Sequence, residues 1–302
     1  MSSENFRGAT FMVLSMAFFA VEDMFIKLLS VELPVAQILA TLGFLGFLSF
    51  AAILKIRGGR FWSRHLMRPI VLLRNLGEIL GSVGVVFALA ISDLSSVAGI
   101  LQALPLAIAL GAAVFLGEPV GWRRWTAISA GFFGVLMIIR PGFAGFEPAS
   151  LAALMGVFGL ALRDVATRRI PRYIHSDQLS ASAFGALVLA ALVVGPIMGQ
   201  PLVPPDLNHI LLFAGTRIAG VGGYALLVTA TRIAEASSVA PYRYSRLLFA
   251  LIIAFVVFQE RPDTLTLTGA AIIMLSGGYT MWREAGLRRR KLREAGIIAP
   301  GD

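Results

Sequence analysis

Residues 237 to 260 read SSVAPYRYSRLLFALIIAFVVFQE, and this stretch sets the first constraint on the fold. From Leu247 to Phe258 it contains no polar side chain, which is typical of a helix dissolved in lipid. Two arginines, Arg243 and Arg246, stand just before this apolar run, beside Tyr244. A guanidinium group inside an apolar helix is energetically costly, so its presence indicates a function or a buried partner.

The composition of the whole chain agrees with this local reading. Of the 302 residues, 57% are hydrophobic and only 14% are charged, and the mean hydropathy is +0.81. These values predict a polytopic membrane protein. The net charge of +9 does not indicate nucleic-acid binding, because the basic residues cluster between apolar runs. The absence of cysteine excludes disulfides and thiol chemistry.

Apolar runs long enough to span a bilayer recur along the chain. Crossing the hydrocarbon core takes about 20 mainly apolar residues, and Gly, Pro and charge separate the runs, as in RPGFAGFEP and GQPLVPPD. Within the third run, Gly77 and Gly81 have the spacing of small residues that marks a close helix interface. We predict an all-α integral membrane fold with ten transmembrane helices. The expected spans are 8–29, 34–54, 69–91, 96–116, 124–140, 149–170, 179–198, 208–230, 237–258 and 265–282.

The distribution of Lys and Arg predicts the orientation. If the N-terminus is inside, the inner loops carry most of the basic residues, including the segment RGGRFWSRHLMR, whereas the outer loops hold only Arg140 and Arg261. Short loops rich in Lys and Arg stay in the cytoplasm, so both termini are expected there, in a bacterial-type inner membrane. We expect residues 285–302 to form a basic cytoplasmic tail that lies near anionic lipid, without a nucleic-acid partner.

The two halves of the chain are similar to each other. A shift of 142 places VFALAISDLSSVAGILQALPLAIALGAAVFLGE over VTATRIAEASSVAPYRYSRLLFALIIAFVVFQE, with SSVA over SSVA and Glu118 over Glu260. The same shift places Glu22 over Asp164. We predict one five-helix repeat in residues 1–142 and a second in 143–284. An odd number of spans makes the second copy inverted, and inverted repeats are a hallmark of alternating-access carriers whose site lies near the midplane.

Two further blocks carry a family resemblance. LGEPVGWRRWTAISAGFFGVLMIIRPG and FQERPDTLTLTGAAIIMLSGG, with the SSVA helix openings and the ten-span pattern, resemble EamA-type members of the drug/metabolite transporter superfamily. The resemblance extends from Arg7 to Arg283. It implies a carrier of small metabolites with a cavity formed mainly by spans 1, 3, 4, 6, 8 and 9. Relatives handle amino acids, S-adenosylmethionine, riboflavin and similar solutes, but this chain lacks the aromatic cluster of the aromatic-amino-acid exporters in spans 3 and 4.

Ionisable residues inside the expected spans are the candidates for the site, because a charge at the bilayer centre costs about 2.5–3.5 kcal/mol on insertion scales. Arg74 and Glu78 stand four residues apart, a spacing at which side chains meet on one helix face. They form either a structural ion pair or a free site for substrate, and the sequence leaves both alternatives open. Asp164 and Arg168 share that spacing. Arg217 and Arg246 have no acid at such a spacing, so their partners must come from another helix or from a substrate.

These residues suggest a mechanism. The forked guanidinium group of an arginine suits a planar carboxylate on the substrate. An acidic side chain of the protein binds the amino group of the substrate or carries a coupling proton. Tyr244 either stacks on the substrate or is an interfacial aromatic, and Gln102 supplies neutral contacts. The expected substrate-binding residues are Arg246, Arg217, Arg243, Tyr244, Gln102, Glu78 and Arg74, and the expected coupling or charge-pairing residues are Glu22, Asp23 and Asp164.

We therefore expect a secondary transporter of a small amphiphilic metabolite, such as an amino acid or a related carboxylate or zwitterion, acting as a monomer or homodimer. A larger or cationic metabolite, such as S-adenosylmethionine, riboflavin or a methylated amine, is the alternative. An intramembrane enzyme is the alternative outside transport. His65 and His175 fall in expected loops and His209 at the very start of the expected span 208–230, so no metal site or cofactor is expected. Only Asp23 with Asp164 leaves a paired-aspartate enzyme open.

Overall fold

The computed structural model describes residues 3–59, 63–117, 121–140, 147, 149–171, 173–233 and 240–294, and these residues form helices without a strand. The helices begin and end mostly at the Gly, Pro and charged connections seen in the sequence. Their bounds are α1 Ser3–Leu29, α2 Val35–Ile56, η1 Arg64–Met67, α3 Pro69–Ile91, α4 Leu94–Leu101, α5 Leu104–Leu116, α6 Trp122–Ile139, α7 Ala149–Arg169, α8 Ser176–Met198, α9 Leu207–Ile233, η2 Ala240–Tyr244, α11 Ser245–Phe258 and α12 Thr264–Glu294.

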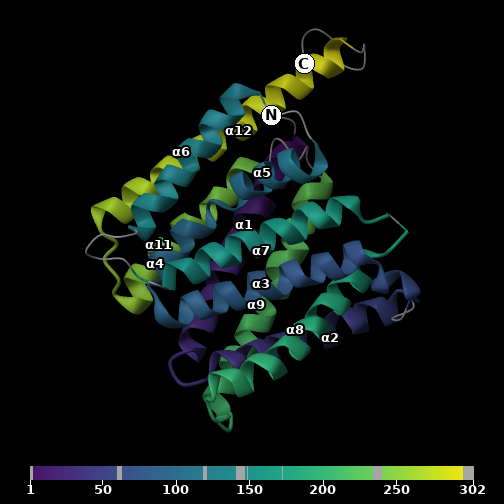
Figure 1. Cartoon of the computed structure of the whole chain (residues 1–302), viewed down its shortest axis with the longest axis vertical. Coiled ribbons are helices and arrows are strands. Elements are labelled where there is room, and N and C mark those ends of the chain that lie inside the picture. The colour runs from purple at the N-terminus through teal and green to yellow at the C-terminus, as the bar shows by residue number, and fades with distance from the viewer. Residues whose placement is uncertain are drawn as a thin grey trace.

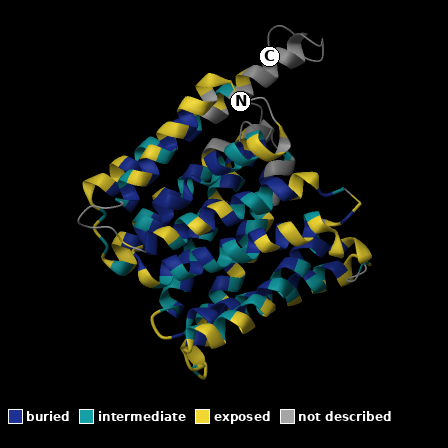
Figure 2. Ribbon diagram, viewed as in Figure 1, coloured by how far each residue is buried: buried dark blue, intermediate teal, exposed yellow. Residues whose placement is uncertain are grey.

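Much of the described surface is suited to lipid. Seven stretches are long and apolar enough to cross a membrane, and 125–139 and 264–279 form shorter apolar helices. Exposed residues follow the outer faces of α2, α8, α6 and α12, while buried residues fill the centre (Figure 2). Large apolar side chains such as Leu192 and Phe133 are among the exposed ones. The chain is a multi-pass membrane protein. The seven stretches are 6–29, 35–56, 69–91, 94–115, 149–169, 177–198 and 207–227.

Three expected spans differ from the helices in the structure. The span 96–116 is two helices, α4 and α5, because Pro105 in the first turn of α5 has no N–H to continue the α4 ladder. The described part of 237–258 begins with the short η2 turn before α11. The last span continues as α12 to Glu294, so the first part of the expected tail is helical. Residues 237–239 and 295–302 lie outside the described residues.

The helices pack in pairs that join the two halves of the chain. α3 packs along α7, α1 along α9, α2 along α8, and α6 along α12. Figure 1 shows α6 and α12 at one edge of the bundle, α2 and α8 at the opposite edge, and the other pairs between them. Under the 142-residue shift, the pair α3 and α7 corresponds to α9 and α1, while the two edge pairs each correspond to themselves.

The interface between α3 and α7 depends on glycine. A Cβ added at Gly77 would lie 2.8 Å from the carbonyl oxygen of Gly159, and one at Gly84 would lie 2.5 Å from the Gly156 amide nitrogen. A Cβ at Gly81 would collide with Leu160. Only glycine permits this approach of the two backbones. The prediction that Gly77 and Gly81 mark a close helix interface is confirmed.

Candidate functional site

Arg246 at the start of α11 is bound to Asp23 of α1. Its Nη2 donates to Oδ1 at 2.8 Å and to Oδ2 at 2.7 Å, and its Nε donates to Oδ2 at 3.2 Å. The guanidinium carbon lies 5.6 Å from the centre of the Phe19 ring. These contacts supply the partner that α11 itself lacks, and they join the two halves of the chain through a fork of charge-assisted hydrogen bonds.

A second ionic group joins α3 to α7. The two oxygens of Glu78 lie 3.5 Å from Nη2 of Arg74 and 3.2 Å from Nη1 of Arg163. Arg163 Nε also donates to the neighbouring Asp164 at 2.8 Å, and Arg74 donates to the carbonyl oxygen of Leu179 in α8. Arg74 and Glu78 therefore form the structural pair that their spacing allowed.

One acid and one base of the cluster are left without such a bond. Glu22 is close to Asp23 and Arg246, and Arg243 in η2 is close to Asp164 and Arg246. Neither has a hydrogen bond or ion pair among the described residues. The carboxylate of Glu22 lies against Gly220 of α9, where a Cβ would be 2.6 Å from Oε1. A free carboxylate and a free guanidinium thus flank the bonded pair of Asp23 and Arg246.

The protein leaves part of the cluster uncovered, although the cluster belongs to membrane-spanning helices. The side chains of Arg163 and Asp164 keep 27% and 29% of their surface exposed, and that of Arg246 keeps 24%. Asp23 is almost completely covered, at 4%. Charged groups inside a bundle are stabilised when they pair, as the groups of this cluster do.

The remaining predicted site residues lie apart from these bonds. Arg217 of α9 is partly buried and has no ion pair among the described residues. Tyr244 is buried, with its hydroxyl packed against Gly277 of α12 and without a hydrogen-bond partner in the described part of the chain. Gln102 sits in the break between α4 and α5 and donates to the carbonyl oxygen of Ala98 at 3.2 Å.

A further charged group, separate from those of Arg246 and Glu78, lies where α1 ends and α4 begins. Glu260, just after α11, accepts hydrogen bonds from the backbone N–H groups of Leu94 and Ser95 at 2.8 and 2.9 Å. Lys27 lies 3.7 Å from Glu260 and donates to the carbonyl oxygen of Ser92 at 2.5 Å. A carboxylate at a helix N-terminus satisfies free amides and the helix dipole. We call Lys27, Glu260 and the first turn of α4 the Lys27–Glu260 clamp.

The arrangement does not suggest catalysis. The two aspartates that a paired-aspartate enzyme would share are held by different arginines, Asp23 by Arg246 and Asp164 by Arg163. No group of three or more His, Cys, Asp or Glu suited to a metal ion occurs among the described residues. Ion-paired charges buried within a bundle of membrane-spanning helices are a feature found in membrane transporters.

Comparison with known proteins identifies the family. The EamA-like transporter family matches residues 6–140 and 148–279, and the chain belongs to this family of the drug/metabolite transporters. The "S-adenosylmethionine uptake transporter" of Rickettsia conorii is 28% identical over 229 residues, covering 74% of this chain and 76% of the relative. The "Pseudopaline exporter CntI" of Pseudomonas aeruginosa is 26% identical over 271 residues, covering 89% and 94%. Both are transporters rather than enzymes.

A crystal structure of another protein has the same fold. The two chains superpose with a TM-score of 0.60 at 20% sequence identity, over 97% of this chain and 99% of the other. The likeness therefore extends over nearly the whole helical bundle, and it concerns the fold alone.

Sequence reasoning missed some partners within this site. Arg163 was not among the expected site residues, because its bond to Glu78 crosses between helices and has no local spacing to reveal it. The contact of Glu22 with Gly220 had a counterpart in the sequence comparison of the two halves, because the 142-residue shift places Gly220 over Glu78. One half of the chain thus has a carboxylate where the other has a glycine that makes room for the carboxylate of Glu22.

Proposed function

We propose that this protein is a secondary carrier that moves α-amino-carboxylate metabolites across the membrane by alternating access. The observation that carries the proposal is a pair of opposite charges, Glu22 and Arg243, which lie near the Asp23–Arg246 pair and have no hydrogen bond or ion pair among the described residues. A zwitterion supplies the missing partner to each: its carboxylate binds the Arg243 fork and its ammonium group binds Glu22.

The proposed motion rests on two inverted halves, 1–142 and 143–284, in a ten-span bundle with both termini cytoplasmic. Two observations support it. The family matches the chain in two separate segments, 6–140 and 148–279, and the helix pairs correspond to one another under the 142-residue shift. Two halves related in this way rock about a site between them, so the same charges face each side of the membrane in turn.

S-adenosylmethionine is the first solute to test. It is an α-amino acid that also carries a sulfonium cation, so it presents both charges of the proposed site, and the Rickettsia relative bears its name. An unpaired acid also suits a solute with a net positive charge. The phenyl ring of Phe19, beside Arg246, gives an apolar wall at the same place.

Uptake of labelled S-adenosylmethionine into proteoliposomes tests the proposal. We expect saturable uptake that Glu22→Gln and Arg243→Ala reduce at least tenfold, since a hydrogen bond to a charged group contributes about 1.5–3 kcal/mol. Arg7→Gln, which removes an exposed arginine, is the matched control and keeps wild-type uptake. Absence of saturable uptake for S-adenosylmethionine and for a panel of amino acids would remove the proposal.

Competition by a decarboxylated analogue assigns the carboxylate to its arginine. The analogue should compete with the labelled substrate more weakly than the intact solute does in the wild type, but equally well in Arg243→Ala. The variant has already lost the bond to the carboxylate that the analogue lacks. If Arg243→Ala still discriminates and Arg217→Ala or Arg246→Ala does not, the carboxylate site moves to that arginine.

We further propose that a proton bound to Glu22 couples transport to the proton gradient. Glu22 lies within a membrane-spanning helix beside Asp23 and has no ion pair among the described residues, so it is the acid that we assign to the coupling proton. An uncoupler should then abolish accumulation of the solute while leaving exchange of internal for external solute intact. Accumulation that survives the uncoupler would exclude proton coupling without affecting the carrier proposal.

A further inference from the structure

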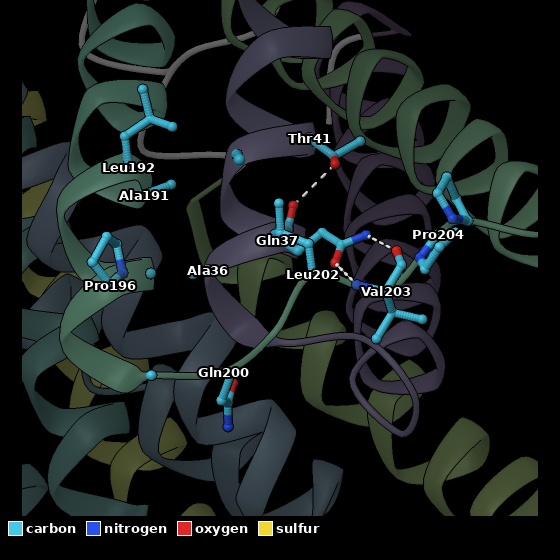
Figure 3. A pocket seen from close by; sticks show the side chains of 14 residues that line it. Ala36, Gln37, Thr41, Ala191, Leu192, Pro196, Gln200, Leu202, Val203 and Pro204 are labelled. Atoms are coloured by element: carbon cyan, nitrogen blue, oxygen red, sulfur yellow. Dashed lines mark hydrogen bonds between the residues drawn. The ribbon is translucent and has the colours of Figure 1, made fainter.

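An apolar groove of about 700 Å³ lies between α2 and α8, at the opposite edge of the bundle from α6 and α12. It exists because the facing residues are small: Ala36 and Ala40 on α2, and Ala191 and Gly195 on α8. Figure 3 shows the two helix walls and the segment 200–205 that closes one end. The groove is within the roughly 300–1,000 Å³ of pockets that bind ligands.

The closing segment, QPLVPPD at 200–206, is suited to apolar surroundings. Its three prolines have no N–H to leave unsatisfied. The side-chain amide of Gln37 holds Val203 twice: it accepts from the Val203 N–H at 2.9 Å and donates to the Val203 carbonyl at 2.6 Å (Figure 3). A backbone segment with few free donors can lie against lipid without a large desolvation cost.

The rim beside this segment is acidic. Asp206 follows the lining residue Pro205, and His209 joins it to Glu32, with Nδ1 at 2.8 Å from Asp206 Oδ1 and Nε2 at 3.1 Å from Glu32 Oε2. His209 itself is buried, but the side chains of Glu32 and Asp206 are 63% and 62% exposed. Two largely exposed carboxylates therefore lie beside the segment that closes the apolar groove.

We propose that the groove is a binding site for phosphatidylethanolamine. One acyl chain fills the space left by the small residues, where a void would forfeit dispersion contacts. The ammonium of the headgroup meets the carboxylates of Glu32 and Asp206. The same rim repels a lipid with a net negative headgroup, so charge selects the aminophospholipid over phosphatidylglycerol.

Native mass spectrometry of the protein released from nanodiscs tests this site, because the mass of each bound lipid identifies it. In equal amounts of phosphatidylethanolamine and phosphatidylglycerol, the wild type should retain the former with a preference of roughly fivefold or more, as expected from one charge near a membrane surface. Ala40→Phe fills the groove and should lose the tightly retained lipid. Ala130→Phe, which adds the same ring to an exposed position of α6, is the matched control and should retain it.

The headgroup arm uses variants that leave the packing unchanged. Glu32→Gln with Asp206→Asn keeps the acceptors for His209 and should retain lipid while the preference falls to about one. This arm decides the question even if Ala40→Phe fails to fold. Equal retention in Ala40→Phe and Ala130→Phe, or a preference for phosphatidylglycerol, overturns the proposal. A change from dimer to monomer in Ala40→Phe with the lipid count unchanged also overturns it, because the groove would then hold a second copy of the chain.

Discussion

At the scale of single residues, the bidentate bond of Arg246 to Asp23 separates a structural role from a transport role. Breaking a buried ion pair by removing one partner costs about 3–5 kcal/mol, whereas neutralising both partners costs much less. We expect Asp23→Asn and Arg246→Gln each to lower the thermal unfolding temperature. The double variant should recover most of that loss, because the uncompensated charge is gone.

Transport should not recover with stability, since the proposed site needs these charges. Arg246→Lys keeps the charge but cannot reproduce the three donor contacts of the fork, so we expect folded protein with impaired uptake. The measurement is thermal unfolding and proteoliposome uptake on the same preparations. Wild-type uptake in Arg246→Lys, or in the double neutral variant, would assign the pair to structure alone.

Two aspartates in the loops between helices, Asp263 and Asp93, predict opposite effects of pH on stability. Partial burial opposes ionisation of Asp263, but hydrogen bonds from Arg140 and Thr266 outweigh it and hold its pKa below the usual value. Burial and the nearby charges of Glu260 and Glu147 raise the pKa of Asp93. The stability from Asp263 is therefore present above its unfolded pKa, near 4, and is lost as the pH falls through its folded pKa. Ionised Asp93 instead costs stability; this cost is full above its raised folded pKa, shrinks as the pH falls further, and is gone below its unfolded pKa.

We therefore expect Asp263→Asn to lower the unfolding temperature at neutral pH and Asp93→Asn to raise it. Each effect should correspond to less than about 1 kcal/mol, because both groups are partly solvated. The effect of Asp263→Asn should vanish below the lowered folded pKa of Asp263, and that of Asp93→Asn below the unfolded pKa of aspartate, near 4. Thermal unfolding in detergent between pH 3 and 7 measures both, and shifts of the same sign in the two variants would contradict this assignment of charges.

At the scale of helices, the close contact of α3 and α7 predicts a large cost for one added methyl group. A Cβ at Gly159 would collide with the backbone of α3 at Gly81, which cannot move as a side-chain tip can. We expect Gly159→Ala to destabilise the protein by more than about 1–3 kcal/mol, the usual cost of overpacking. Gly278→Ala in α12 is the control, because nothing lies within 4 Å of its added Cβ. Equal unfolding temperatures for the two variants would refute the glycine contact.

The helices themselves were largely predictable, and their pairing was not. Apolar length, with Gly and Pro at the connections, locates most helices to within a few residues. The break before Pro105 was visible in principle, but a proline alone does not decide between a kink and two helices. Which helix packs on which depends on surfaces far apart in the sequence.

The same limit holds for the charges. The bond of Arg74 to Glu78 follows from a spacing of four, whereas Asp23 and Arg246 are 223 positions apart. No local pattern relates the rotation and depth of α1 to those of α11. The sequence therefore indicated which charges are buried and left their partners open. Tyr244 is a further example, because it packs against α12 rather than among the charged groups of the cluster.

At the scale of the whole molecule, the Lys27–Glu260 clamp predicts how the balance between conformations can be shifted. It ties the end of α11 to α4 and α1 through the carboxylate of Glu260. If the proposed alternating access opens the molecule at this end, those bonds break, so Glu260→Gln, which loses the charge, should favour the open form. The chain has no cysteine, so cysteines introduced at the exposed Val31 and Arg261 can be spin-labelled as a single pair. We expect double electron–electron resonance to show a larger fraction of long distances between the two labels in Glu260→Gln.

The control is Asp263→Asn, which breaks a neighbouring bond to Arg140 outside the clamp and should keep the wild-type distance distribution. If both variants match the wild type, the clamp is a static cap of α4, and opening must occur elsewhere in the bundle.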